Sequence, residues 1–128
     1  MFARYTGTPS SQGGKLVRYT LPMPPSVNAM YRRNPRGYGM YKTPEAKIWI
    51  QECLHHIRRK NPLKGKVDVS IEFYFKRERD IDNSIKAALD LMQQANVIEN
   101  DSQVYSLLIT KGFDKDNPRM EISIEENN

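Results

Sequence analysis

The stretch RDIDNSIKAALDLMQQANVIEND, residues 79–101, organises this chain. Its apolar residues recur every three to four positions until about Ala95, which predicts an amphipathic helix. Asp80 and Asp82 stand where this helix begins, and Asp101 follows it after a short linker. The stretch therefore places acidic side chains at both ends of one helix.

Strands are predicted on both sides of this helix. Residues 66–76 alternate apolar and polar side chains, and residues 103–111 are rich in β-branched and aliphatic ones. A first strand over residues 15–21 and a final one around residues 120–124 show the same alternation. Asn96 suits the left-handed C-terminal cap of the helix between them.

An earlier helix is predicted from Pro44 to about Lys60. Thr43 suits its N-cap, and proline is favourable at the first helical position. Trp49 and Cys53 are interpreted as core residues of this helix. The order strand, helix, strand, helix, strand, strand predicts a single α+β domain over residues 15–126. We expect two helices packed on a mixed sheet, with the last two strands paired as a hairpin.

Length and composition limit the class of protein. A chain of 128 residues suits one domain, and its single cysteine excludes an intrachain disulfide. Residues 1–14 are rich in Gly, Ser and Thr and predict a flexible tail without an apolar signal core, so we expect a cytoplasmic protein. No apolar run is long enough for a membrane span.

Charge is distributed unevenly along the chain. Residues 1–60 hold eleven Lys and Arg against two acids, and residues 61–128 hold nine against thirteen. The basic half would attract phosphate, whereas the carboxylates of the acidic half would repel it unless cations intervene. This combination suits a metal-using enzyme that acts on a polyanion, although a basic protein without a nucleic-acid role explains the charge equally well.

Basic and tyrosine side chains are interleaved in residues 26–43, which predict a long polar loop or at most a hairpin. Arginine binds phosphate and tyrosine stacks on bases, so this composition suits DNA contact, while an ordinary solvated loop is the alternative. With the charged cluster that follows residue 75, the predicted DNA-binding residues are Arg32, Arg33, Arg36, Lys42, Lys76, Arg77 and Arg79.

The carboxylates suggest a metal site. Asp80 and Asp82 are one residue apart, and in an extended chain both would point to the same side. Asp101 can join them if the strand after the helix returns beside the strand before it. Oxygen ligands select hard cations, with Mg²⁺ expected and Mn²⁺ as a common substitute. The alternative is that these residues are a solvated turn and a helix cap.

Lys86 lies one helical turn after Asp82, on the same face. Its ammonium group could neutralise charge that builds on a scissile phosphate. The alternative is a simple surface ion pair with Asp82, which would contribute little. Asp90, two turns beyond Asp82, is either a more distant ligand or a solvated residue.

Three motifs make the chain resemble the RusA family of Holliday-junction resolvases over about residues 16–125. They are LPMPPSVNAMYR at residues 21–32, RDIDN at residues 79–83 with Lys86 beyond it, and VIENDSQV at residues 97–104. The proline-rich motif is weak by itself. The RDxDN–xx–K element, followed about a helix later by Asp-x-Gln-Val, is specific.

The resemblance implies a homodimeric endodeoxyribonuclease with a RusA-like fold. Such enzymes bind four-way DNA junctions and use Mg²⁺ to nick two strands of like polarity symmetrically. The essential aspartates and the catalytic lysine of the family fall on Asp80, Asp82, Asp101 and Lys86, with Asn83 in support. Some members carry a second Asp where this chain has Asn100, which puts an extra ligand there in doubt. Many members are encoded by prophages, so a phage origin is a further expectation.

Two other functions remain open at this stage. A junction-binding module would use the carboxylates only structurally and would never nick DNA. A less selective Mg²⁺-dependent nuclease would cut flaps or replication forks as well as junctions.

Overall fold

The computed structural model describes residues 15–26, 30–35, 37 and 39–127. The tail predicted over residues 1–14 lies outside the described residues. The main sheet consists of β1 (Leu16–Leu21), β4 (Val67–Phe75), β5 (Val104–Phe113) and β6 (Arg119–Glu126). The helices are α2 (Pro44–Ile57) and α3 (Asp82–Gln94). Among the described residues, neither helix combines the length and the apolar character needed to cross a membrane.

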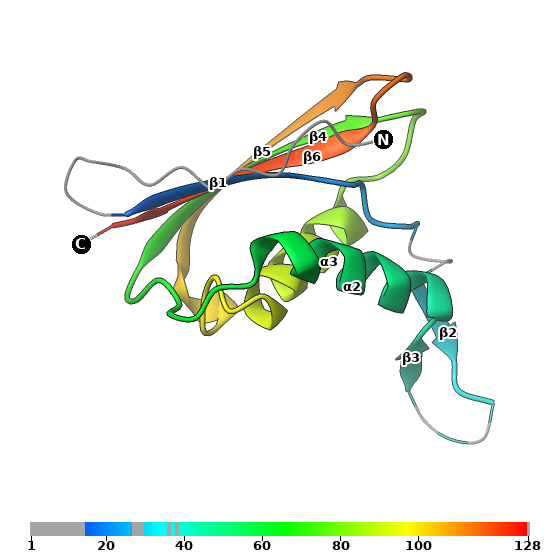
Figure 1. Ribbon diagram of the computed structural model, residues 1–128. Coiled ribbons are helices and arrows are strands. Elements are labelled where there is room, and N and C mark those ends of the chain that lie inside the picture. Colours follow the sequence, from blue (N-terminus) through cyan, green and yellow to red (C-terminus); the bar gives the residue numbers. More distant parts are fainter. Residues whose placement is uncertain (1–14, 27–29, 36, 38, 128) are drawn as a thin grey trace.

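The sheet is mixed, and its strand order is β1-β6-β4-β5. β6 runs antiparallel to both of its neighbours, whereas β5 runs parallel to β4. Helices α2 and α3 lie on the same face of the sheet (Figure 1). The predicted α+β class and the order of its main elements are confirmed.

The expected hairpin between the last two strands is wrong, because β4 lies between β5 and β6. The physical reason is burial. Along β6 the buried Met120, Ile122 and Ile124 alternate with partly covered residues, and they sit opposite core residues of β4. β5 lacks such an alternation and takes the edge. The turn after β5 passes the end of β4, where the Asp114 N–H donates to the Phe75 carbonyl at 2.9 Å.

The core fills the space between the sheet and the helices. β4 supplies the buried side chains of Val69, Ile71 and Phe73, as its alternation predicts. From α2, Trp49 and Cys53 are buried, and the Trp49 indole N–H donates to the Pro22 carbonyl at 3.1 Å. Their interpretation as core residues is confirmed.

The polar segment before α2 forms a hairpin of β2 (Tyr31–Arg33) and β3 (Met40–Lys42). In Figure 1 it extends away from the main sheet beyond one end of α2. The Thr43 side chain caps α2 by accepting from the Ala46 N–H at 3.2 Å, as predicted. The second predicted cap is also confirmed, because Asn96 has a φ of 59° in the left-handed region after α3.

Candidate active site

Helix α3 begins at Asp82 without a side-chain cap. Ile81 occupies the N-cap position in a helical conformation, and no side chain there accepts from the first turn. The possibility that Asp82 simply caps the helix is therefore wrong. Its carboxylate belongs to the first turn, where the helix dipole stabilises a negative charge.

A hollow of about 420 Å³ lies against α3. Asp82, Lys86 and Asp90 recur at four-residue intervals, so they follow one face of the helix. Asp101 joins them because β5, the strand after the helix, pairs with β4, the strand before it, as predicted for this case. The residues that line the hollow are Asp82, Ile85, Lys86, Leu89, Asp90 and Asp101.

The charged side chains that line this hollow are unpaired as far as the structure describes the chain. Within the described part of the chain, neither Lys86 nor any of the three carboxylates has a hydrogen bond or an ion pair through its side chain. The surface ion pair between Lys86 and Asp82, which was the alternative explanation of their spacing, is thus not formed. Three carboxylates against one ammonium leave an excess of negative charge, which an added cation would reduce.

The donor set suits a hard divalent cation, because every acidic ligand offered is a carboxylate oxygen. Among the described residues, however, no three acidic, His or Cys side chains stand close enough together to form a metal centre. The hollow thus offers ligands of the type that Mg²⁺ prefers, but its carboxylates are too far apart to bind one ion together. Side-chain movement or a bound phosphate group would have to complete it.

Asp80 is exposed and is not among the residues that line the hollow. The expectation that residues 80–82 are extended is wrong. Ile81 has φ −87° and ψ −21°, which is helical, so the two carboxylates do not alternate as they would in a strand. The role of Asp80 as a ligand stays a prediction.

Asp101 is held by a network around the side-chain amide of Gln103. The Gln103 Oε1 accepts from the backbone N–H groups of Glu99 at 2.7 Å and Asn100 at 3.0 Å. Its Nε2 donates to the carbonyls of Leu63 at 2.9 Å and Gly65 at 2.8 Å. The two Oε1 contacts close the loop before β5 on itself, and the two Nε2 contacts attach this loop to the loop before β4.

Two further contacts act on Asp101 and its neighbours. The Asp101 N–H donates to the Oε1 of Gln93 on α3 at 3.1 Å. The Asn100 Oδ1 accepts from the Ser102 N–H at 2.8 Å, which completes a capping box with Gln103 around the short turn Asp101–Gln103. Asn100 and Gln103 belong to the VIENDSQV motif, and their supporting role is visible only in the folded chain. Their three-residue spacing was the signal that predicts such a box.

Arg79 was predicted to bind DNA, but its guanidinium makes contacts inside the protein. The Nη2 donates to the carbonyls of Pro24 at 2.9 Å and Pro25 at 3.3 Å and to the Ser84 hydroxyl at 3.3 Å. The group also lies 5.2 Å from the ring centroid of Phe75. Burial lowers the pKa of Arg79. These contacts join the proline-rich segment to the beginning of α3.

The other predicted DNA-binding residues are divided between two places. Arg33 is exposed on β2, Lys42 is partly covered at the end of β3, and Lys76 and Arg77 are exposed just after β4. Arg36 and the side chain of Arg32 lie outside the described residues. Asn83 is exposed in the first turn of α3.

Comparison with known proteins gives one family. The family model described as Endodeoxyribonuclease RusA matches residues 22–125. The crossover junction endodeoxyribonuclease RusA of Escherichia coli K12 is 32% identical over 114 residues, which cover 84% of this chain and 92% of that protein. The protein of the same name from Aquifex aeolicus is 31% identical over 102 residues, 74% of this chain and 77% of the relative.

A phage protein shows the same similarity. The crossover junction endodeoxyribonuclease of Enterobacteria phage HK97 is 29% identical over 116 residues, which cover 85% of this chain and 93% of the phage protein. The family match spans the proline-rich segment from residue 22, the carboxylate hollow and the main sheet except β1 and the last residue of β6. The chain belongs to the RusA family of endodeoxyribonucleases.

Proposed function

We propose that this protein is a Mg²⁺-dependent endonuclease that resolves four-way DNA junctions by paired, symmetric nicks. The observation that carries the proposal is the hollow lined by Asp82, Asp90, Asp101 and Lys86, whose charged groups have no ion-pair partner among the described residues. Relatives over most of the chain are crossover junction endodeoxyribonucleases by name. The cytoplasmic location and the prophage origin expected from the sequence stay predictions.

Asp82 and Asp101 are the proposed core of the metal site, with Asp80 as the third ligand expected from the family resemblance. Asp90 lines the same hollow and is available as a further oxygen donor. When bound, Mg²⁺ or Mn²⁺ supplies Lewis acidity toward a phosphoryl oxygen and lowers the pKa of a water molecule. Gln93 accepts from the backbone N–H of Asp101 and Gln103 accepts from that of Asn100, and these bonds support the turn that carries Asp101 beside α3.

Lys86 is proposed to act on the substrate. Lys86 lies between Asp82 and Asp90 on α3, in the hollow where the scissile phosphate would bind. Its ammonium group would stabilise the negative charge that develops on that phosphate during cleavage. Phosphates farther from the cut would meet the basic residues of the hairpin and of the segment after β4, including Arg33, Lys76 and Arg77.

A homodimer gives the paired cuts a physical basis. The strands of a four-way junction are related in pairs by two-fold symmetry, and a symmetric dimer offers two identical sites at a fixed separation. The dimer therefore belongs to the same proposal.

The test is cleavage of a synthetic four-way junction with and without Mg²⁺, with the nicks mapped on all four strands. We expect Mg²⁺-dependent nicks at matching positions on two strands, and none with Asp82→Asn, which should still bind the junction. Equal cleavage by Asp82→Asn would overturn the assignment. Tight binding with no nick under any divalent metal would identify a binding module. Equal cutting of flaps and linear duplex would identify a less selective nuclease.

A further inference from the structure

β5 is an unusually exposed edge strand. It is the longest strand of the main sheet, and in the described part of the chain only β4 pairs with it. Of the five large apolar side chains that the described residues leave exposed, four lie on this strand. They are Tyr105 at 67%, Leu108 at 62%, Phe113 at 56% and Leu107 at 42% exposure.

The opposite edge of the sheet is different. β1 has six residues, buries Val17, Tyr19 and Leu21, and presents Arg18 to solvent. Natural edge strands are protected by short length, charge or proline. β5 has no proline, and its single charged residue, Lys111, is turned back onto the protein. The Lys111 ammonium pairs with Glu78 and lies 5.7 Å from the ring centroid of Phe75.

We propose that the free edge of β5 pairs antiparallel with β5 of a second copy of this chain. The proposal rests on the homodimer of the proposed function and names its interface. A two-fold axis brings the same strand of each copy together, so the edge must be complementary to itself. An apolar edge with backbone hydrogen-bonding groups and one neutralised lysine meets this requirement. It also avoids direct contact between like charges of two chains that each carry a net +5.

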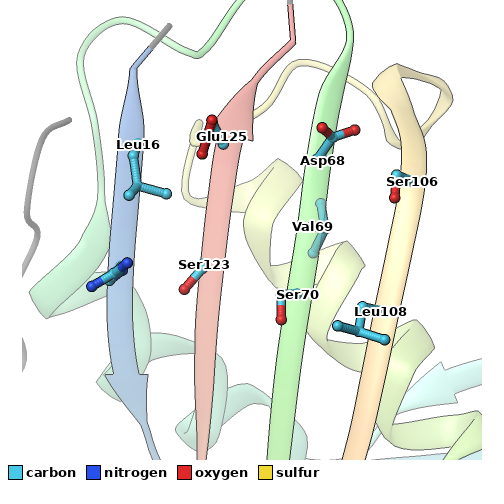
Figure 2. Close-up of a pocket in the computed structure, with 9 residues that line it drawn as sticks. Leu16, Asp68, Val69, Ser70, Ser106, Leu108, Ser123 and Glu125 are labelled. Carbon is cyan, nitrogen blue, oxygen red and sulfur yellow. The ribbon is translucent and has the colours of Figure 1, made fainter. Parts of the chain in front are cut away.

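This pairing has a consequence for the active sites. When two sheets join edge to edge through antiparallel strands, the two-fold axis is perpendicular to the joined sheet. The helices of both copies then lie on one face, and both carboxylate hollows with them. The other face carries Asp68 and Glu125 (Figure 2). By register it also carries Glu72 and Glu121, against Arg18 and Arg119, so it has an excess of acidic residues in both copies. Such a dimer presents both hollows to the same side of a polyanionic substrate.

The exposed area is consistent with a moderate association. Covering an aromatic side chain completely removes about 150–250 Å² from water. With two partly exposed aromatic and two leucine side chains, each copy would bury on the order of 400 Å² of apolar surface, or on the order of 800 Å² for the pair. Backbone and polar atoms add to this value, which approaches the ~1,200 Å² at the lower end of stable interfaces. We therefore expect a dimer whose population depends on concentration.

Leu108 is proposed to lie nearest the two-fold axis. It is on the outer face of β5 together with Ser106, on the last strand at that side of the sheet (Figure 2). An axis at Leu108 would place Leu107 opposite the partner's Ile109 and Ser106 opposite the partner's Thr110. Leu107 and Ile109 would then meet on the face that carries the helices, and on the outer face the two Leu108 side chains would meet between hydroxyl pairs.

Cysteine cross-linking tests this register. Cys53 is the only native cysteine; it is buried, and burial raises the pKa of its thiol to about 12, so it stays unreactive. Under mild oxidation Leu108→Cys should form a disulfide-linked dimer within minutes, whereas Arg18→Cys on β1 should stay monomeric on a denaturing gel. Equal cross-linking of the two variants, or none at any position from 106 to 110, would overturn the interface.

Sedimentation equilibrium of the full chain gives a second readout. Leu108→Lys should raise the dimer dissociation constant at least about tenfold, because two unpaired ammonium groups would meet at the axis. The matched variant Thr20→Lys, on the outer face of β1, should leave it unchanged. A dimer that Leu108→Lys does not weaken would place the interface elsewhere and leave the proposed function intact. A wild-type chain that stays monomeric both alone and on a junction would overturn the interface and the paired nicking together.

Discussion

Two groups of carboxylates in this protein differ in how they are partnered. At one end of β6, Arg119 donates to Asp114 and to Glu121, each at 2.8 Å, and its guanidinium lies 4.2 Å from the ring centroid of Tyr74. Around the hollow, the described residues offer the side chains of Asp82, Asp90 and Asp101 no such partner. Folding alone explains the first group. The second holds three carboxylates and one ammonium group without ion pairs among the described residues, which is the pattern expected where a bound cation supplies the missing positive charge.

The largest expected effect comes from exchanging one carboxylate of each group for its amide. Asp101→Asn should lower the rate of junction cleavage at least about a hundredfold and keep junction binding, since only a proposed ligand is lost. Asp114→Asn is the matched control and should cut at the parent rate. Single-turnover cleavage and gel-shift binding of the three proteins measure this. Equal cleavage rates for Asp101→Asn and Asp114→Asn would show that the carboxylates of the hollow have no special role in catalysis.

Lys86→Ala should slow single-turnover cleavage by about a hundredfold with little change in junction affinity. The reason is that its ammonium lies in the hollow among the carboxylates and not on the basic hairpin. Lys115→Ala, in the exposed turn after β5, is the control of equal charge change. If Lys86→Ala instead loses binding at an unchanged rate, Lys86 positions the DNA and has no part in the chemistry.

Gln103→Leu should raise the Mg²⁺ concentration needed for half-maximal cleavage by about tenfold. Its amide makes four hydrogen bonds around Asp101, and residues that support ligands typically affect metal affinity by about 10–100-fold. Gln94→Leu, exposed near the end of α3, should change nothing. A Mg²⁺ titration measures the shift. A lower thermal stability with an unchanged Mg²⁺ requirement would show that Gln103 supports only the fold.

The smallest expected effect concerns pH. The hydrogen bond from Arg119, and then that from the Asn117 N–H, lowers the pKa of Asp114. The folded protein thus holds this carboxylate ionised at a lower pH than the unfolded chain does. Its stabilisation is complete above the ordinary aspartate pKa of about 3.9 and is lost as the pH falls through the lowered value. Asp114→Asn should therefore have a slightly lower Tm at neutral pH, and the difference should vanish in acid. A constant difference at every pH would contradict this.

The helices and strands were predictable because they depend on local spacing. A few neighbouring residues are enough to recognise the alternation along β4, the caps Thr43 and Asn96, and the apolar stripe of α3. The placement of β6 between β1 and β4 was not predictable, because it depends on which strand buries its apolar face better. The turn between β5 and β6 is compatible with either arrangement.

The candidate site was predicted in part for the same reason. Lys86 and Asp82 share a helical face by spacing, and Asp101 joins them through the parallel return of β5. The position of Asp80 was missed because one residue, Ile81, takes a helical conformation. Arg79 looked like a surface cation, since only the folded chain brings the carbonyls of Pro24 and Pro25 to its guanidinium.

By itself, then, the amino-acid sequence determined the family, the kinds of elements and the acidic and basic residues offered to DNA. Composition, periodicity and short motifs are properties of the sequence that can be recognised without knowing the tertiary structure. The tertiary structure alone decided which carboxylates face one hollow, which cation is withdrawn into the protein and which strand is left at an open edge. Those outcomes depend on contacts between segments far apart in the chain, where competition for burial and for hydrogen-bond partners selects one arrangement.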